Sequence, residues 1–176
     1  VHWTGQTYNL SDQIDCLCSF FAEILKFQAN SVSEIFCMHA ATAVYEDRAI
    51  IFPGDFRVGK STLAAVLASR GLKILSDDAI FIVPEKAQAV SPGISPRLRL
   101  PLPAGLSQTT HCFLKETLVT TGKRYGYISL PQEQQPNNGF AAPIAAILVP
   151  MREKESKAQI SIMSHDNALK ELIWHN

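Results

Sequence analysis

The sequence has no excess of charge of either sign, because its 16 Lys and Arg residues balance its 16 Asp and Glu residues. A protein that binds nucleic acid or a membrane surface by general electrostatic attraction usually carries a basic excess. We therefore expect no nucleic-acid partner, and any phosphate-binding site must be a local one. No apolar run reaches the roughly 18 residues that span a bilayer, so we expect no membrane partner either.

Cysteine is scarce and follows no ligand pattern. The chain contains Cys16, Cys18, Cys37 and Cys112, with no C-x-x-C pair and no histidine at zinc-ligand spacing near them. This pattern favours reduced, partly buried thiols in a cytoplasmic protein.

Length and composition are typical of one globular domain. The chain has 176 residues, of which 47% are apolar and 18% are charged, and this is enough to bury a substantial core. No internal repeat or linker divides it. We expect a single domain over 1–176, with an N-terminal helical segment at 1–33, a nucleotide-binding core at 34–83 and a strand-rich region with a final helix at 84–176. The N-terminal segment either packs on the sheet or mediates self-association, which leaves a homo-oligomer open.

Hydrophobic periodicity and turn residues predict an α/β fold with a mixed β-sheet flanked by helices. Helices are expected at 11–30, at 60–70 and at 167–174, where Ser164 or Asp166 caps the last one. Strands are expected at 35–40, 42–45, 48–53, 72–75, 118–121, 124–130, 145–150 and 158–163, with 79–83 continuing the strand at 72–75. The proline-rich stretch 84–112 is interpreted as short strands joined by loops.

Residues 54–61 read G-D-F-R-V-G-K-S and fit the P-loop motif G-x-x-x-x-G-K-[ST] at every fixed position. Gly54 and Gly59 permit backbone conformations that turn successive N–H groups toward phosphate oxygens, and the N-terminus of the following helix adds partial positive charge. Lys60 is expected to reach the β- and γ-phosphates, and the Ser61 hydroxyl to bind Mg²⁺. The sequence thus predicts ATP and Mg²⁺ as cofactors. The predicted nucleotide-binding residues are Gly54, Asp55, Phe56, Arg57, Val58, Gly59, Lys60, Ser61 and Thr62.

Two adjacent carboxylates, Asp77 and Asp78, follow the next apolar strand. The helix after the P-loop leads about 15 Å away from the phosphate site and the strand returns by about 16 Å. A right-handed crossover lays that strand parallel to the one at 48–53 and brings both aspartates beside the P-loop. One can hold Mg²⁺ and the other can accept the proton of an attacking hydroxyl. His39, at the end of an apolar strand, is a third candidate, although a lone histidine there is more often a core residue.

The stretch from Met38 to Ile82 resembles the catalytic domain of the HPr kinase/phosphorylase family. It is most similar to the shorter HPr-kinase-related serine kinases, including those of lasso-peptide clusters. The resemblance rests on Met38-His39 before the P-loop, on Arg70-Gly71 at the end of the following helix and on Asp77-Asp78. It covers 35–83 well and extends loosely through 96–100, 123–124 and 143–149.

The resemblance implies an ATP- and Mg²⁺-dependent kinase that phosphorylates a serine on a protein or peptide. It places catalytic roles on Lys60, Asp77, Asp78 and His39 and metal ligation on Ser61 and Asp77. The basic residues expected to contact phosphate or substrate are Arg97, Arg99, Lys123 and Arg124. The family's glycine-rich signature after the aspartates is missing, which argues against the reverse phosphorylase reaction and against HPr as substrate. Arg57 stands where the family has a small residue, and it either narrows the loop or points outward.

Two other functions fit the same residues. The P-loop alone permits a kinase whose acceptor hydroxyl belongs to a small metabolite. A nucleotide-binding regulatory module without turnover is the second alternative, and the intact Asp-Asp pair argues against it.

Overall fold

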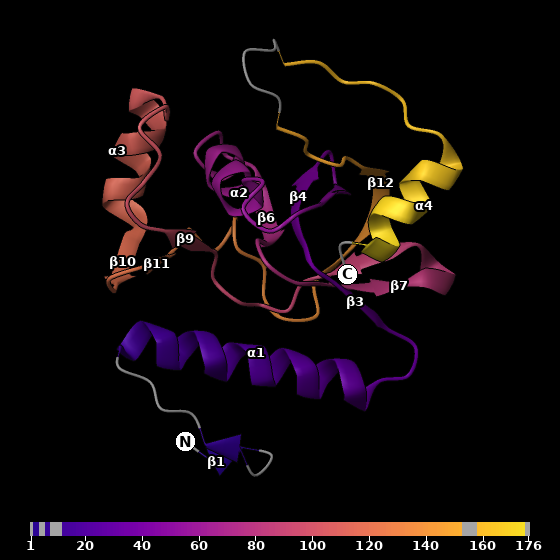
Figure 1. The fold of residues 1–176 in the computed structure, drawn as a ribbon, viewed down its shortest axis with the longest axis horizontal. Helices are drawn as coiled ribbons and strands as arrows, with labels where there is room; N and C mark the ends of the chain where they lie inside the picture. The colour runs from indigo at the N-terminus through magenta and orange to yellow at the C-terminus, as the bar shows by residue number, and fades with distance from the viewer. Residues whose placement is uncertain (1, 4–5, 8–11, 153–157, 175–176) are drawn as a thin grey trace.

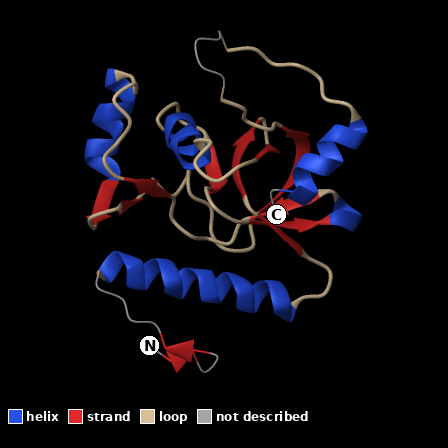
Figure 2. Ribbon diagram, viewed as in Figure 1, coloured by secondary structure: helices blue, strands red, loops and turns tan. Residues whose placement is uncertain are grey.

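A computed structural model describes residues 2–3, 6–7, 12–152 and 158–174. Helices pack around a curled mixed β-sheet, with a smaller sheet and one long helix beside it (Figures 1 and 2). In the ranges that the structure describes, no helix combines the length and the apolar character needed to cross a membrane.

The main sheet has seven strands in the order β3-β7-β8-β12-β5-β4-β6. Their bounds are Phe36–Met38 (β3), Ala40–Tyr45 (β4), Arg48–Pro53 (β5), Lys73–Ser76 (β6), Ile80–Val83 (β7), Gln88–Val90 (β8) and Ala141–Ile147 (β12). Strand β12 runs parallel to β5, and the other described pairings in this sheet are antiparallel. The α/β fold with a mixed sheet, predicted from the sequence, is confirmed.

A three-stranded antiparallel sheet lies beside the main one, in the order β10-β11-β9. It consists of Arg97–Arg99 (β9), Leu118–Thr121 (β10) and Tyr125–Ile128 (β11). The remaining strands, His2–Trp3 (β1) and Gln6–Thr7 (β2), form a separate pair. The other elements are the helices Gln13–Ser31 (α1), Lys60–Ala68 (α2), Gln108–Thr117 (α3) and His165–Trp174 (α4), and the 3-10 turn Pro84–Lys86 (η1).

Small side chains let α2 approach the main sheet closely. Ala64, Ala65 and Ala68 of α2 pack in one core with Ala41 and Ala43 of β4, and all five are almost fully buried. Alternate residues of a strand face opposite sides of the sheet, and Ala40 and Val44 of the same strand belong to a second core. The helix after the P-loop is therefore held rigidly against the sheet.

The segment 84–112 differs from its prediction, because it contains a helix as well as two short strands. Helix α3 begins after Ser107, whose hydroxyl accepts a hydrogen bond from the Thr110 backbone N–H at 3.2 Å. Its buried residues are Thr110 and Leu114. A helix with so few buried apolar positions gives a weak periodic signal in the sequence.

Two strand predictions are wrong, because one segment has no strand partner and the other pairs with different strands. No strand forms at 158–163, where Ile160 and Ile162 are fully exposed, because alternating apolar residues make a strand only when a neighbour supplies the hydrogen bonds. Residues 80–83 do not continue the preceding strand but pair with β3 and β8. The final helix starts two residues earlier than predicted, at His165. Ser164, one of the two predicted caps, accepts a hydrogen bond from the Asn167 N–H at 3.4 Å.

Candidate functional site

Four strand ends meet at one edge of the main sheet. Strands β5 and β12 are parallel, and β6 runs in the same direction as β5 because both are antiparallel to β4, which lies between them. The carboxyl ends of β5, β6 and β12 therefore share an edge with the amino end of β4. These ends lead into the P-loop, the Asp77-Asp78 pair, the segment 148–152 and His39, respectively.

The P-loop has the backbone that its glycines permit. Gly54 and Gly59 have φ angles of 141° and 115°, values that favour glycine. The Lys60 ammonium donates to the carbonyl oxygens of Gly54 at 2.7 Å and Asp55 at 3.0 Å, and Lys60 is almost fully buried. Burial lowers the pKa of Lys60, against the pull of the neighbouring aspartates. The ammonium is thus fixed at the loop, where incoming phosphate oxygens could replace the carbonyls.

Arg57 points away from the cradle. Its φ of 70° lies in the left-handed region that is costly for a residue with a side chain. Its guanidinium sits 5.2 Å from the centre of the Phe56 ring, which is itself 70% exposed. The bulky side chain that replaces the small residue of similar motifs is therefore accommodated outside the loop.

Asp77 is a buried acid in contact with the P-loop. The Ser61 hydroxyl and the Arg97 backbone N–H face its carboxylate and act to lower its pKa, while its Oδ2 atom is buried without a hydrogen-bond partner among the described residues. Burial, followed by the negative charge of Asp78, raises the pKa of Asp77 to about 7. A buried oxygen without a partner is costly, so this atom is available to an additional ligand.

Asp78 is more open and has two partners. Its carboxylate lies 3.3 Å from Nδ1 of His39 and 3.2 Å from Nη2 of Arg97, with about half of the side chain exposed. Burial and the nearby Lys60 ammonium lower the pKa of His39, although Asp78 opposes them. A neutral imidazole can still donate one N–H to the carboxylate and hold its orientation. The structure thus brings together Lys60, Ser61, Asp77, Asp78 and His39, and their roles stay predictions.

The residues present fit Mg²⁺. This ion prefers oxygen ligands and usually takes one or two from the protein, with water and phosphate oxygens completing the octahedron. The Ser61 hydroxyl and the free Oδ2 of Asp77 supply such oxygens side by side. In the described part of the chain, no three His, Cys, Asp or Glu side chains gather as a metal cluster, so a site built by protein ligands alone is not the arrangement here.

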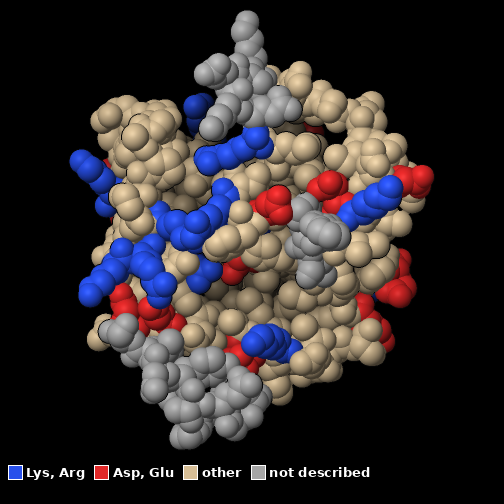
Figure 3. Space-filling view, viewed as in Figure 1, with Lys and Arg blue, Asp and Glu red and all other residues tan. Residues whose placement is uncertain are grey.

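Three of the four basic residues predicted to contact substrate surround one aromatic ring. The guanidinium groups of Arg97, Arg99 and Arg124 lie 4.7, 5.3 and 6.0 Å from the centre of the Tyr125 ring. Arg97 lies at the aspartates. Arg99 stacks over the rings of Tyr125 and Phe56, each 5.3 Å away. On the face of the molecule shown in Figure 3, basic side chains gather mainly on one half.

Arg124 forms a 2.7 Å ion pair with Asp15 of α1, and the backbone N–H of Lys123 donates to Asp12. These two residues therefore attach α1 to the smaller sheet. A contact of their side chains with substrate stays a prediction, as it does for Arg99.

Sequence reasoning missed Arg152. Because β12 runs parallel to β5, the chain after it passes the P-loop: a Cβ on Gly54 would lie 3.5 Å from Pro150, and one on Gly59 would lie 4.0 Å from Nη2 of Arg152. Arg152 is exposed and forms no ion pair with any described residue. A basic residue soon after an apolar strand was the available signal, but only the parallel pairing places it here.

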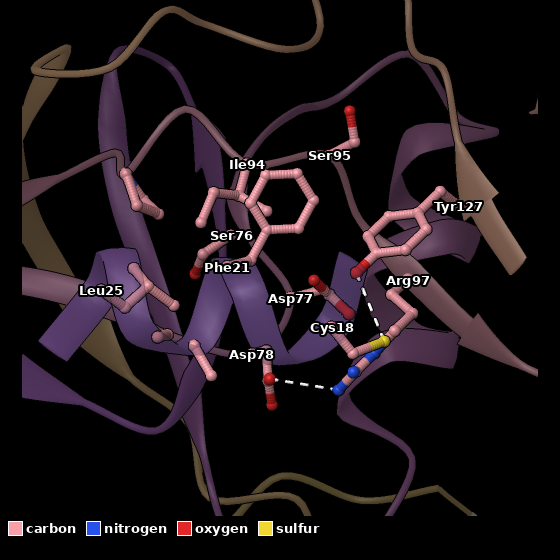
Figure 4. Close-up of a pocket in the computed structure, with 13 residues that line it drawn as sticks. Cys18, Phe21, Leu25, Ser76, Asp77, Asp78, Ile94, Ser95, Arg97 and Tyr127 are labelled. Atoms are coloured by element: carbon pink, nitrogen blue, oxygen red, sulfur yellow. Dashed lines mark hydrogen bonds and ion pairs between the residues drawn. The ribbon is translucent and has the colours of Figure 1, made fainter. Parts of the chain in front are cut away.

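A cavity of about 200 Å³ opens on the other side of the aspartates (Figure 4). Asp77, Asp78 and Arg97 line it together with Tyr127, and α1 forms its opposite wall. The lining residues from α1 are Cys18, Phe21, Ala22 and Leu25. The sequence predicted a helix in this segment but not that it borders the aspartates.

Comparisons with known proteins show a similarity of structure but no match in sequence. No protein-family model matches the chain, and no curated protein matches it in sequence. Among solved structures, the Hpr(Ser) kinase/phosphatase from Coxiella burnetii is similar, with a TM-score of 0.41 and 18% identity over 72% of this chain. The match covers 66% of that protein, slightly less than two thirds of its length. A likeness at this level identifies no activity, and the family suggested by the motifs stays a prediction.

Proposed function

We propose that this chain is a P-loop kinase. More specifically, we propose that it transfers the γ-phosphoryl group of ATP to a serine hydroxyl of a protein or peptide, as an HPr-kinase-related enzyme. The observation that carries the proposal is the contact of Ser61 with the buried Asp77 beside Lys60, with the half-exposed Asp78 next to it. A phosphate cradle, oxygen ligands for Mg²⁺ and a solvent-accessible carboxylate are what phosphoryl transfer requires.

The P-loop holds the nucleotide in this proposal. Backbone N–H groups of 55–61 and the N-terminus of α2 bind phosphate oxygens, and Lys60 exchanges its two carbonyl partners for the β- and γ-phosphates. Ser61 and Asp77 hold Mg²⁺, which when bound neutralises charge on the phosphates. Arg152 reaches the cradle from the parallel strand and adds a positive charge near the transferred group.

Asp78 acts as the general base. It takes the proton of the serine hydroxyl while the serine oxygen bonds to the γ-phosphorus. The bond between the γ-phosphorus and the β–γ bridging oxygen breaks, and the products are ADP and phosphoserine. His39 and Arg97 orient the carboxylate from two sides.

The test measures where labelled phosphate goes. The protein is incubated with Mg²⁺ and γ-labelled ATP in the presence of pooled seryl peptides, the same peptides with threonine or alanine for serine, and a pool of hydroxylated metabolites. Lys60→Ala and Asp78→Ala are the matched variants, and ATP affinity is measured separately by calorimetry. We expect label on seryl peptides from the wild type and none from either variant, with nucleotide binding retained by Asp78→Ala.

Two outcomes would replace the proposal. Label on a metabolite and on no peptide would identify a small-molecule kinase that uses the same P-loop. ATP binding without label on any acceptor would identify a regulatory nucleotide-binding module. Full activity of Asp78→Ala would refute the role of this residue as base while leaving the kinase proposal in place.

A further inference from the structure

Helix α1 is fitted to the smaller sheet by specific contacts at its N-terminal half. The Asp12 carboxylate caps the helix by accepting from the Ile14 N–H at 2.8 Å and also accepts from the Lys123 N–H at 3.1 Å. A Cβ on Gly122 would lie 2.6 Å from Oδ2 of Asp12, so the sheet approaches the helix cap as closely as a glycine allows. One carboxylate thus begins the helix and fixes its place.

Further along the helix, contacts reach the cavity itself. The Tyr127 hydroxyl hydrogen-bonds to Sγ of Cys18 at 3.4 Å, and the Phe21 ring packs edge-on against Tyr127 with 5.8 Å between ring centres. Figure 4 shows Cys18 close to the Arg97 guanidinium, which also contacts Asp78. Helix α1 therefore faces the aspartates across the cavity and does not merely cover a core.

The cavity combines acidic and apolar walls. Its lining near the sheet is polar, with Asp77, Asp78 and Arg97, whereas Phe21 and Leu25 of α1 are apolar. Its volume of about 200 Å³ is below the roughly 300 Å³ at which pockets for drug-sized ligands begin. A nucleotide does not fit in it, but one amino-acid residue does.

We propose that this cavity is the acceptor subsite and that α1 sets its size limit. It admits a single hydroxyl-bearing residue or a molecule of that size, with the hydroxyl toward Asp78 and the carbon atoms against Phe21 and Leu25. The inference rests on the proposed kinase function. It adds that acceptor and nucleotide enter on opposite sides of the Asp pair, and that selection of the acceptor comes from the N-terminal helix and not from the P-loop.

The test narrows the cavity from α1. Ala22 lines the cavity but is exposed, so Ala22→Phe adds bulk at the cavity without removing a buried side chain. Gln13→Phe is the matched control, because Gln13 is exposed in the first turn of the same helix and is remote from the cavity lining. We expect Ala22→Phe to raise the KM for a seryl peptide by about tenfold or more, as steric changes in binding pockets do, with unchanged ATP affinity. Gln13→Phe should behave as the wild type.

A second readout does not depend on transfer. Cys18 lines the cavity, and Cys112 is an exposed thiol on another helix. Alkylation of each by iodoacetamide is followed by mass spectrometry, with and without N-acetyl-L-serine methylamide as the probe. The probe should slow alkylation of Cys18 and leave that of Cys112 unchanged.

The outcomes separate the two proposals. If the wild type transfers phosphate and Ala22→Phe keeps the wild-type KM, the kinase stands and the acceptor subsite is refuted. If the wild type transfers nothing, the kinase proposal fails and the alkylation experiment decides alone. Equal alkylation of Cys18 with and without the probe then overturns the subsite, and selective protection supports it.

Discussion

The buried carboxylate of Asp77 should make the stability of the metal-free protein depend on pH. Its pKa is raised from an ordinary 3.8 to about 7 by burial and by Asp78. Between these two values the folded state keeps a proton that the unfolded state has released. The stabilisation is therefore complete below about pH 4 and is lost as the pH rises through about 7.

The size of the effect follows from the two pKa values. A separation of about 3 units corresponds to about 4 kcal/mol in the free energy of unfolding, and about 2.5 kcal/mol of it falls between pH 5 and pH 8. Asp77→Asn removes this titration and keeps the shape of the side chain. The variant should therefore gain about 2.5 kcal/mol relative to the wild type between these two pH values.

Urea unfolding with EDTA present measures this difference at pH 5, 6, 7 and 8. Asp47→Asn is the matched control, because it makes the same chemical change at an exposed turn whose positive φ Asn tolerates. Comparing both variants with the wild type removes contributions from groups that titrate in all three proteins. If the stability difference between Asp77→Asn and the wild type stays constant with pH, the carboxylate is not held in its protonated form and the reasoning is wrong.

Four further substitutions test individual contacts. Lys60→Ala should abolish phosphoryl transfer and weaken ATP binding in calorimetry, and full turnover would refute the role of Lys60. It should also lower the free energy of unfolding by about 1–2 kcal/mol, because two loop carbonyls lose their donor. Arg152→Gln should lower kcat by about tenfold or more, because it removes a positive charge at the loop. The free energy of unfolding should change little, because Arg152 has no ion-pair partner among the described residues. An unchanged kcat would exclude Arg152 from the site. His39→Ala should lower kcat with little effect on ATP affinity, because His39 contacts the proposed base Asp78. Weaker ATP binding with an unchanged kcat would contradict this role of His39. Arg57→Gly should raise the free energy of unfolding in urea by up to about 1 kcal/mol, because glycine relieves the left-handed strain. A clear loss of stability would show that the Phe56 contact matters more.

Local chemistry was enough to predict the parts of the site that are close in sequence. Strand β5 has the predicted bounds, and the P-loop and the start of α2 follow directly. Glycines, turn residues and the change from strand to helix periodicity act over a few residues, so the sequence determines them. The direction of β6, and with it the arrival of Asp77 and Asp78, followed from the handedness of the crossover.

Long-range pairing decided the rest. Only the tertiary structure places β4 between β5 and β6, which brings His39 to the same edge, and only the parallel pairing of β12 brings Arg152 there. The same holds for α1, which the sequence predicted as a helix but whose position opposite the aspartates depends on Asp12, Gly122 and Tyr127. Periodicity shows that a face is buried but not what buries it, since strand partners and helix docking depend on contacts between residues far apart in the chain. The sequence by itself therefore determined the loop that is predicted to bind phosphate, and the tertiary structure decided what surrounds it.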